Sequence, residues 1–379
     1  METNKKIIRA VTVDQSLGFI EPLIEELKDK YEIQVLSSEG ENIERICKQY
    51  NVKGFAINMY RRISLLKDLK SLLKLICVFN KEKPSMVHSM TPKAGMLCML
   101  AAWITRVPRR VHTFTGLIWP TSRGLSRRIL MFTDWITCAC ATHIIPEGKG
   151  VMTDLQNSIT NKPMKVLGYG NVRGVDMVRF SKRIDIKKKA SGIRKENLFT
   201  FIFVGRIVRD KGINELVEAF VLLQKKYNDV RLLLIGNYED SIDPLSKTTK
   251  EKIESSAFIE HLGSKRGDDL VAYYAASDCF VFPSYREGFP NTVMEAGAMD
   301  LPCIVTDING SREIIEEGVN GLIIQSQKTD ELYNAMEKML SDKKMFSEMQ
   351  MKARPMIETR FEQSFVRQCL LDFYEEIMW

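Results

Sequence analysis

Short apolar runs alternate along the chain with longer amphipathic segments. In the first half these runs are Ile7–Thr12, Ile33–Ser37, Val52–Ile57, Met86–His88, Arg110–Phe114 and His143–Ile145. A second set consists of Leu198–Val204, Val230–Gly236, Phe258–Gly263, Asp278–Pro283 and Leu301–Thr306. Near-continuous apolar runs are typical of strands that are buried on both faces of a parallel sheet. The pattern predicts an α/β protein with two doubly wound, Rossmann-like domains that face each other across a cleft.

The two sets of strands are separated by Asn171–Ser191, where Gly174 and the charged run Lys182–Lys189 interrupt the apolar periodicity. We expect this segment to be the linker, with an N-terminal domain over residues 1–175 and a second domain over residues 176–360. The last segment, 361–379, is amphipathic and is expected to form a helix. In open parallel sheets ligands bind at the carboxyl ends of the strands, so functional residues are expected in the loops that follow them.

The composition is that of a globular protein with an ample core, because 45% of the 379 residues are hydrophobic and 27% are charged. Eight cysteines lie mostly inside apolar runs and show no C-x2-C spacing, which indicates reduced thiols. The chain enters its first strand without the apolar region of a signal peptide. Its longest apolar stretch, Ala94–Ile104, is shorter than the roughly 20 residues of a membrane-spanning helix. We therefore expect a cytoplasmic protein.

The segment Pro283–Glu295, P-S-Y-R-E-G-F-P-N-T-V-M-E, carries two carboxylates. It follows a strand, contains a turn with Gly and Pro, and leads into a predicted helix, Thr292–Ala298. A helix start after such a turn offers free backbone N–H groups and the positive end of the helix dipole to an anion. Glu287 on the turn and Glu295 inside the helix add acceptors for hydroxyl groups. The pattern indicates a site for a nucleotide sugar, and the alternative is a solvated helix start.

Two cations follow the strand Leu198–Val204. Gly205 ends the strand, and Arg206 and Lys211 lie on the loop before the predicted helix Ile213–Lys226. A guanidinium can bind two phosphate oxygens at once, and an ammonium adds a point charge. No acidic cluster that could hold Mg²⁺ is apparent, so we expect these side chains, without a metal ion, to balance a diphosphate. The alternative is two ordinary surface cations at a strand end.

The order G-R-x4-K-G followed by E-x7-E resembles that of the retaining glycosyltransferases of family 4, which have the two-domain GT-B fold. Gly168–Phe180 also matches the G-x-G-x3-G-V-D-x3-F segment that closes the N-terminal domain in that family. The resemblance covers nearly the whole chain. It implies a catalytic role for Arg206, Lys211 and Glu287: the cations bind the diphosphate and stabilise it as it departs, and the glutamate faces the transferred sugar. It also implies that residues 361–379 cross back to the first domain.

The same resemblance implies a wider donor-binding set. Glu295 matches the glutamate that faces the nucleotide ribose, and Leu262 belongs to a Leu-Gly pair near which the donor base packs. The other expected contacts lie at the strand end and along the E-x7-E turn, at Gly205, Gly288, Phe289, Asn291, Thr292 and Val293. No metal ion and no cofactor is expected, since the nucleotide sugar is a substrate.

The N-terminal half matches the family less closely. Val87–Gly95, V-H-S-M-T-P-K-A-G, is similar at most positions to the V-H-T-H-T-P-K-A-G segment of capsule and O-antigen glycosyltransferases. The resemblance suggests acceptor-side residues in three loops, with Leu17, Gly18, His88, Lys93 and Thr115 as the candidates. Thr115 stands where relatives often carry a histidine. The nearby His112 falls within a predicted strand and is better explained as a packed core residue.

The net charge of +7 is unevenly distributed. From Lys83 to Thr133 there is no Asp or Glu, and within this span Trp119–Phe132 interleaves arginines with large, exposed-looking apolar residues. Such basic amphipathic segments suit the surface of an anionic membrane, and we favour that interpretation over a solvated charged face. A second segment, Arg61–Lys81, carries a stripe that we expect to pack on the N-terminal sheet: Leu65, Leu66, Leu69, Leu72, Leu73 and Ile76. Nucleic acid is not an expected partner, because no binding motif accompanies the charge.

These features predict a retaining, metal-independent glycosyltransferase that moves a sugar from a nucleotide sugar, most simply a UDP-sugar, to a polyprenyl-diphosphate-linked saccharide. The reaction is expected at the inner face of the cytoplasmic membrane, in synthesis of a surface polysaccharide (capsule, O-antigen or exopolysaccharide). The departing phosphate can itself take the acceptor's proton, so a histidine base is not required. Two alternatives stay open. One is a sugar-nucleotide epimerase of the GT-B fold, for which no motif supplies catalytic acids, and the other is a non-catalytic nucleotide-sugar-binding partner of a polysaccharide assembly.

Overall fold

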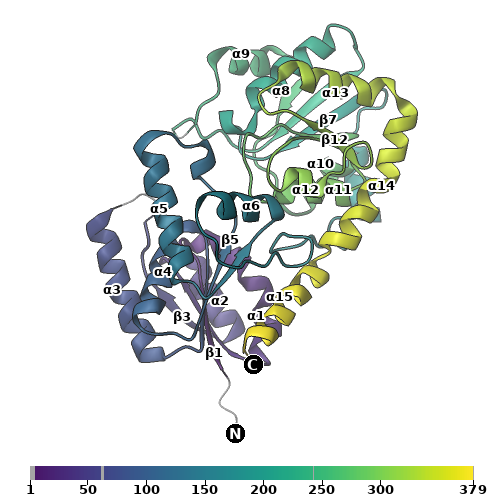
Figure 1. Ribbon diagram of the computed structural model, residues 1–379. Coiled ribbons are helices and arrows are strands. Elements are labelled where there is room, and N and C mark those ends of the chain that lie inside the picture. The colour runs from purple at the N-terminus through teal and green to yellow at the C-terminus, as the bar shows by residue number, and fades with distance from the viewer. Residues whose placement is uncertain (1–4, 61–63, 242, 379) are drawn as a thin grey trace. The chain divides into compact units, whose positions relative to one another are not determined.

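The computed structural model describes residues 5–60, 64–241 and 243–378 of the chain. The chain forms two compact units, the first made of Met1–Arg173 and Val366–Trp379 and the second of Gly174–Phe365 (Figure 1). The chain thus passes between the units twice, after Arg173 and after Phe365. The expected boundaries, after residues 175 and 360, differ from these by two and five residues. Each unit contains a parallel sheet of six strands, which confirms the doubly wound α/β organisation.

The sheet of the first unit has the strand order β3-β2-β1-β4-β5-β6. Its strands are β1 Lys6–Ala10, β2 Glu32–Ser37, β3 Lys53–Ala56, β4 Met86–Met90, β5 Arg109–Phe114 and β6 His143–Pro146. All six lie where the apolar runs predict them. The order changes direction between β1 and β4, so the loops that follow these two strands diverge at the carboxyl edge, where open sheets bind ligands.

Helices cover both faces of this sheet (Figure 1). On one side lie α3 Leu65–Glu82, α4 Pro92–Ile104 and α5 Gly124–Cys140, and on the other lie α1 Ile24–Lys28, α2 Glu41–Tyr50 and α15 Gln363–Met378. Alternate residues of a strand point to the two layers, so Ile8 packs with residues of α3–α5 and Ile7 packs with residues of α15. A further helix, α6 Lys149–Ser158, follows β6. Because α15 supplies Leu370, Phe373 and Tyr374 to this cluster, the last helix completes the core of the first unit.

The second unit has the strand order β12-β11-β10-β7-β8-β9. Its strands are β7 Phe199–Val204, β8 Val230–Ile235, β9 Ile259–His261, β10 Cys279–Phe282, β11 Cys303–Thr306 and β12 Gly321–Ile324. The helices are α7 Ile184–Ser191, α8 Ile213–Gln224, α9 Lys247–Ser255, α10 Gly267–Ala275, α11 Asn291–Ala298, α12 Ser311–Ile314, α13 Thr329–Ser341 and α14 Lys343–Phe361. The sequence predicts the first five strands and misses β12, which is a short run next to a glycine-rich turn.

The segment expected to be a linker is largely folded. It contains α7, which packs against α10 and buries Ile186 and Ala190. Just before it, Val175 pairs with the end of α14: its N–H donates to the carbonyl of Phe361 at 2.8 Å and its carbonyl accepts from the N–H of Gln363 at 3.0 Å. The charges that interrupt the apolar periodicity belong to the solvated side of a short helix.

Leu72 and Ile76 of the α3 stripe pack against the core as expected, but the other four leucines do not. Leu65 and Leu66 are 82% and 84% exposed, and Leu69 and Leu73 are also more than half exposed. The buried side of the helix instead carries Asp68, Ser71, Leu75, Phe79 and Glu82. Apolar residues surround most of this helix, so its periodicity fits two orientations. The structure adopts the one in which Asp68 forms a buried ion pair with Lys93 of α4, at 2.6 Å.

Trp119 is also not exposed as expected. It lies in the short 3₁₀ turn η3, Trp119–Thr121, and is only 4% exposed, with the guanidinium of Arg127 5.8 Å from its ring centroid. The apolar residues that follow it on α5 are exposed as expected: Leu125 by 72% and Phe132 by 58%, the latter stacked on Trp135. The segment Trp119–Phe132 therefore still presents exposed apolar residues, although Trp119 itself is buried.

Two residues at the ends of predicted segments, Arg61 and Trp379, lie outside the described residues. Within the described ranges, none of the helices combines the length and the apolar character of a membrane span.

The buried carboxyl group of Asp134 on α5 should make stability depend on pH. The side chain is 7% exposed, and burial raises the pKa of its carboxyl group to about 7. The folded state therefore holds the proton more tightly than the unfolded state, and stability is lost as the pH rises towards this value. Asp134→Asn cannot ionise, so it should raise the melting temperature relative to wild type more at pH 8 than at pH 5. The corresponding gain in the free energy of unfolding is at most a few kcal/mol.

Thermal unfolding followed by circular dichroism at the two pH values measures this difference. Asp29→Asn, at an exposed aspartate of the same unit, is the matched control. An equal effect of Asp134→Asn at both pH values would show that the carboxyl group is not held protonated.

Candidate functional site

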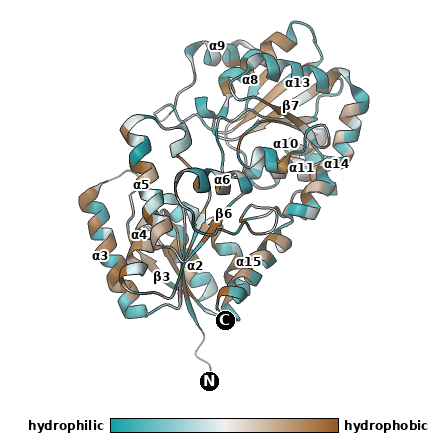
Figure 2. Cartoon of the chain, in the orientation of Figure 1, coloured by the Kyte–Doolittle hydropathy of each residue, from teal (hydrophilic) through white to brown (hydrophobic). Residues whose placement is uncertain are grey.

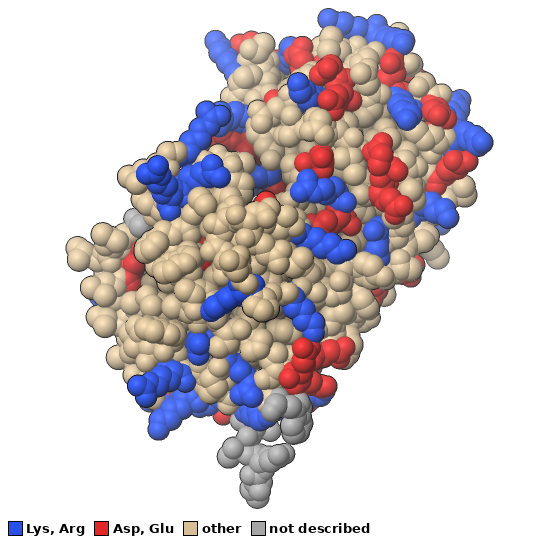
Figure 3. Space-filling view, in the orientation of Figure 1, with Lys and Arg blue, Asp and Glu red and all other residues tan. Residues whose placement is uncertain are grey.

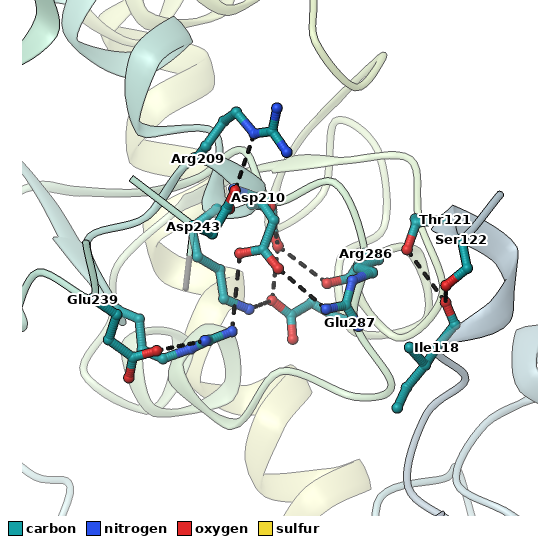
Figure 4. A network of polar contacts seen from close by, with 12 residues as sticks. Ile118, Thr121, Ser122, Arg209, Asp210, Glu239, Asp243, Arg286 and Glu287 are labelled. Atoms are coloured by element: carbon teal, nitrogen blue, oxygen red, sulfur yellow. Dashed lines mark hydrogen bonds and ion pairs between the residues drawn. The ribbon is translucent and has the colours of Figure 1, made fainter. Parts of the chain in front are cut away.

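Three loops meet at one edge of the second sheet because their strands are neighbours. β7 pairs with both β8 and β10, so the loops that follow these strands leave the sheet side by side. The loops after β7 and β10 are joined directly, since the N–H of Tyr285 donates to the carbonyl of Asp210 at 2.8 Å. Figure 4 shows the side chains that these loops bring together. We call this set of loops the β7/β8/β10 edge.

Two glycines allow the loops to come this close. Gly212 has a φ of +71°, and a Cβ atom there would lie 2.1 Å from the carbonyl oxygen of Pro283. A Cβ atom on Gly236 would lie 1.7 Å from the carbonyl oxygen of Gly205. Any side chain at either position would push the loops apart, so these glycines are required by the backbone contacts.

Lys211 and Glu287, 76 residues apart in the chain, form an ion pair at this edge. Their side chains are 13% and 16% exposed. The buried hydroxyl of Ser284 donates to the same oxygen, Oε1 of Glu287, at 2.8 Å. Ser284 is itself held by Thr306, whose hydroxyl donates to the Ser284 carbonyl. The first glutamate of the E-x7-E segment is therefore oriented by two donors before any ligand binds.

Arg206 lies beside this pair with two carboxylates as counter-ions. Its Nη1 is 2.9 Å from Oε2 of Glu239, on the loop after β8, and its Nη2 is 3.9 Å from Oδ1 of Asp210 (Figure 4). Asp210 also accepts from Arg286, at 3.3 Å. The Arg206 side chain is 44% exposed and can reach a ligand. An anion that binds Arg206 must displace these carboxylates or share the cation with them.

Glu295 lies one helical turn into α11 and is half-buried. The hydroxyl of Tyr274 lies 3.3 Å from its Oε2 and donates to it. Burial, and then the charge of Glu295, raise the pKa of Tyr274, so this phenol stays a donor. Glu295 is thus held one helical turn into α11, whereas Glu287 lies on the turn before this helix.

The other residues expected to contact a donor fall into two groups. Gly205, Leu262, Gly288, Asn291 and Thr292 are half-buried. Phe289 and Val293 are buried, and Phe289 packs against Phe361 with ring centroids 5.4 Å apart. Their side chains therefore support the turn from the core, and their contribution to a ligand is restricted to backbone groups. Leu262 follows β9, on the far side of β8 from β7.

In the first unit, His88 lies in the core and not on an accessible loop. β4 continues two residues beyond the predicted strand, and His88 is 1% exposed. Its Nε2 is 2.8 Å from the hydroxyl of Thr113, and its Nδ1 contacts the hydroxyl of Tyr374 on α15. Burial, and then the charge of Arg9, lower the pKa of this imidazole. His88 therefore connects β4 to the C-terminal helix.

Two further candidates on the acceptor side are packed. Lys93 forms the buried ion pair with Asp68, and Leu17 is fully buried. Gly18 is exposed and Thr115 is half-buried, so these two stay accessible at the carboxyl edge of the first sheet.

His112 is a core residue, as expected. It is 1% exposed, its Nδ1 is 2.8 Å from the hydroxyl of Ser89, and burial lowers its pKa to about 3.

The sequence analysis missed three charged residues of the β7/β8/β10 edge. Asp210 and Arg286 stand inside the two recognised motifs. The sequence could have indicated both, because Asp210 lies between two cations and Arg286 directly precedes Glu287. Glu239 lies on the loop after β8. It reaches Arg206, on the loop after β7, only because β8 pairs with β7 in the sheet.

No group of three or more His, Cys, Asp or Glu side chains that could hold a metal ion occurs in the part of the chain that the structure describes.

Comparisons with known proteins identify the family. Models of "Glycosyl transferases group 1" and "Glycosyl transferase 4-like" match residues 184–356 and 10–144. A Staphylococcus aureus protein, "Capsular polysaccharide biosynthesis glycosyltransferase CapM", is 33% identical over 384 residues, which cover 99% of this chain and 98% of the relative. The chain belongs to glycosyltransferase family 4.

Another family 4 relative is the "UDP-Gal:alpha-D-GlcNAc-diphosphoundecaprenol alpha-1,3-galactosyltransferase" of Escherichia coli. It is 30% identical over 331 residues, which cover 82% of this chain and 83% of the relative. Among solved structures, Anabaena HepE in complex with UDP superposes with a TM-score of 0.80 and 18% identity, over 98% of this chain and 100% of that chain. This likeness confirms the GT-B fold.

The pairing of Arg206 with Glu239 leads to a prediction on ligand affinity. Glu239→Gln leaves the shape of the loop but removes a counter-ion, so UDP should bind more tightly, by up to about fivefold for a partly exposed pair. Isothermal titration calorimetry with UDP at low salt measures the change. Asp240→Asn is the matched control, because that neighbouring carboxylate pairs with Lys250 instead. Unchanged or weaker binding by Glu239→Gln would show that Glu239 does not compete for Arg206.

Proposed function

We propose that this glycosyltransferase is retaining and metal-independent, and that it transfers a sugar from a UDP-sugar to a lipid-linked saccharide during synthesis of a surface polysaccharide. The observation that carries the donor side is the Lys211–Glu287 ion pair beside Arg206. In this proposal the two cations on neighbouring loops bind a diphosphate, and the oriented carboxylate of Glu287 binds sugar hydroxyls. Glu295 adds an acceptor one helical turn further in, suited to a ribose.

The printed names of the relatives support the donor and acceptor classes. The Staphylococcus aureus relative is a capsular polysaccharide enzyme, and the Escherichia coli relative combines UDP-Gal with a diphosphoundecaprenol-linked sugar. Both are similar to this chain over more than four fifths of its length. These names favour a UDP-sugar and a polyprenyl-diphosphate-linked acceptor.

The chemistry needs charge stabilisation where the donor breaks. As the bond between the sugar and the diphosphate opens, negative charge grows on the departing phosphate, and Arg206 and Lys211 are placed to stabilise it. The positive end of the helix dipole at the start of α11 adds partial positive charge on the same side. The acceptor hydroxyl attacks on the face that the phosphate leaves, so the configuration is retained. Its proton passes to an oxygen of the departing phosphate, and the buried His88 and His112 take no part.

We further propose that the first unit contacts an anionic membrane through its α3–α5 side. Of the 18 exposed large hydrophobic residues described, 12 lie on these helices or the adjacent turns: Tyr60, Leu65, Leu66, Leu69, Leu73, Trp103, Ile104, Ile118, Leu125, Ile129, Phe132 and Trp135. Figure 2 shows the apolar colouring along α3, α4 and α5. Figure 3 shows the same side as a broad uncharged surface with Lys and Arg groups at its margins. We call this surface the α3–α5 face.

The cations of the α3–α5 face are free to act on lipid head groups. Arg106, Arg123, Arg127 and Arg128 are exposed. Arg109 and Arg110, which also lie in the acid-free span, are engaged within the protein. They donate to the backbone carbonyls of Ile377 and Cys140, respectively. Exposed apolar side chains among exposed cations are what an interfacial surface requires.

The two alternative functions predict different products. Incubation with UDP-sugars and a lipid extract yields a glycosylated lipid if the protein is a transferase. An altered free nucleotide sugar would mean an epimerase, and nucleotide binding without any product would mean a non-catalytic partner. The named relatives favour the first outcome.

Removal of the cations should slow transfer. Arg206→Ala and Lys211→Ala each lose a charge-assisted contact worth roughly 1.5–3 kcal/mol, so transfer should fall about 10- to 100-fold. Transfer of radiolabelled sugar to extracted lipid measures the rate. The matched control is Arg209→Ala, on the same loop, because Arg209 pairs with Asp243. Wild-type rates in both Arg206→Ala and Lys211→Ala would remove the basis of the proposed donor site.

Membrane contact should require both the cations and the leucines of the α3–α5 face. The protein should sediment with vesicles rich in anionic lipid but not with neutral vesicles, and less so as salt screens the charges. Replacing Arg123, Arg127 and Arg128 by Ser should weaken binding about 100-fold, at about 1 kcal/mol for each cation. Replacing Leu65, Leu66 and Leu69 by Ser should weaken it with little change in the salt dependence.

The control for this experiment has the same change of charge in the second unit. Lys187, Lys188 and Lys225 are exposed there, and their triple replacement by Ser should leave vesicle binding unchanged. Binding that resists salt, or that survives both triple replacements in the first unit, would assign the contact to another surface.

A further inference from the structure

A groove runs between the edge strand of the first sheet and helix α3. It has a volume of about 630 Å³ and is lined by Gly54, Phe55, Ala56, Ile57, Lys70, Leu73, Lys74, Cys77 and Val78. The volume lies within the range of small-molecule sites, about 300–1,000 Å³. β3 supplies one wall and the middle turns of α3 supply the other. No residue of the β7/β8/β10 edge belongs to it.

The groove combines an apolar lining with charge of one sign. Its charged residues, Lys70 and Lys74, are one helical turn apart on α3, and both are exposed. Neither forms an ion pair or a hydrogen bond with any residue that the structure describes. Leu73, between them in sequence, is 55% exposed and belongs both to the groove and to the leucine stripe of the α3–α5 face. An open apolar groove beside two cations without counter-ions is complementary to a hydrocarbon chain with an anionic head group.

We infer that this groove binds one hydrocarbon chain of an anionic phospholipid, with the lipid phosphate at Lys70 and Lys74. This site rests on the membrane contact proposed above, and it adds a fixed lipid to a surface that otherwise binds the bilayer diffusely. The stripe Leu66, Leu69 and Leu73 leads from the start of α3 into the groove, so a chain can enter it from the membrane side. The bound lipid covers Leu73 and Cys77, which otherwise face water.

The groove is poorly suited to a β-strand from another protein or from a second copy of this chain. β3 has only four residues, and a short edge strand that carries a lysine is a common protection against strand addition. Its lysine, Lys53, is held at one end of α3 by an ion pair with Glu82 at 2.6 Å. A partner strand would also leave Lys70 and Lys74 without counter-ions.

Cys77 provides a direct probe of the groove. It is the exposed one of the eight cysteines, while Cys47 and Cys369 are half-buried and the other five are buried. The experiment measures the rate at which a maleimide modifies the full-length protein, and Cys77→Ser identifies the part of the signal that comes from this thiol. Three compounds are added in turn: dodecyl phosphate below its micelle-forming concentration, dodecyl maltoside and inorganic phosphate. Dodecyl phosphate should slow modification severalfold, dodecyl maltoside should act only at higher concentration, and inorganic phosphate should have no effect.

Two double replacements of lysines on α3 distinguish binding at the groove from a general effect of positive charge. Lys70→Ser with Lys74→Ser should raise the concentration of dodecyl phosphate needed for protection by about tenfold or more. Lys67→Ser with Lys81→Ser makes the same change of charge on α3 outside the groove lining and should leave protection unchanged. Each variant is compared with its own rate in the absence of added compound, because the lysines also affect the reactivity of the thiol.

The outcomes decide for or against the lipid site. No protection by dodecyl phosphate, equal loss of protection in both lysine pairs, or equal protection by inorganic phosphate overturns it. Protection that grows with protein concentration alone would assign the groove to a second copy and also overturns it. UDP binding, measured on the same samples, tests the proposed donor site separately. Cys77 protection with failed UDP binding would overturn the donor site alone, and intact UDP binding without protection would overturn only the lipid site.

Discussion

The pairing of β7 with β10 is the constraint on which the functional edge of the second unit depends. Arg206 and Lys211 follow one strand and Glu287 follows the other, and only a parallel pairing brings both carboxyl ends to the same edge. The backbone then fixes the distance between the loops, since Gly212 lies against the Pro283 carbonyl and leaves no room for a Cβ atom. The ion pair between Lys211 and Glu287 is a consequence of this backbone contact. It is not what holds the edge together, because the cost of removing two mostly buried charges from water offsets much of their attraction.

The charges at this edge are balanced within the protein. Arg206 has two carboxylate neighbours and Lys211 has one, so a diphosphate does not meet bare cations. Binding is instead an exchange of counter-ions, and its free energy is the difference between two sets of contacts. Such an arrangement limits affinity while it keeps the cations oriented. With the nucleotide-sugar donor proposed above, product release benefits from that limit, because tight binding of the released nucleoside diphosphate would slow turnover.

The sequence alone predicted most of the fold and the loops that carry Arg206, Lys211 and Glu287, and its errors have physical causes. Strands buried on both faces are visible as apolar runs, and motifs at strand ends place Arg206, Lys211 and Glu287 on neighbouring loops. Burial at helices was less predictable, because α3 is apolar around most of its circumference. Its orientation follows a buried ion pair between Asp68 and Lys93, residues of different helices that no local pattern connects. The same holds for His88, whose partner Tyr374 is 286 residues away, and for Glu239, which reaches Arg206 only through the strand order.

The place of α15 in the first unit has a consequence for how the protein is made. All six strands of the first sheet leave the ribosome before the second unit does. Leu370, Phe373 and Tyr374, which complete one layer of the core around that sheet, are translated only after the second unit. Until then the side of the sheet that carries Ile7, Met86 and Val111 lacks part of its cover. The second unit is contiguous and can close as soon as its own residues have emerged. The half that is translated first is therefore the half that finishes folding last.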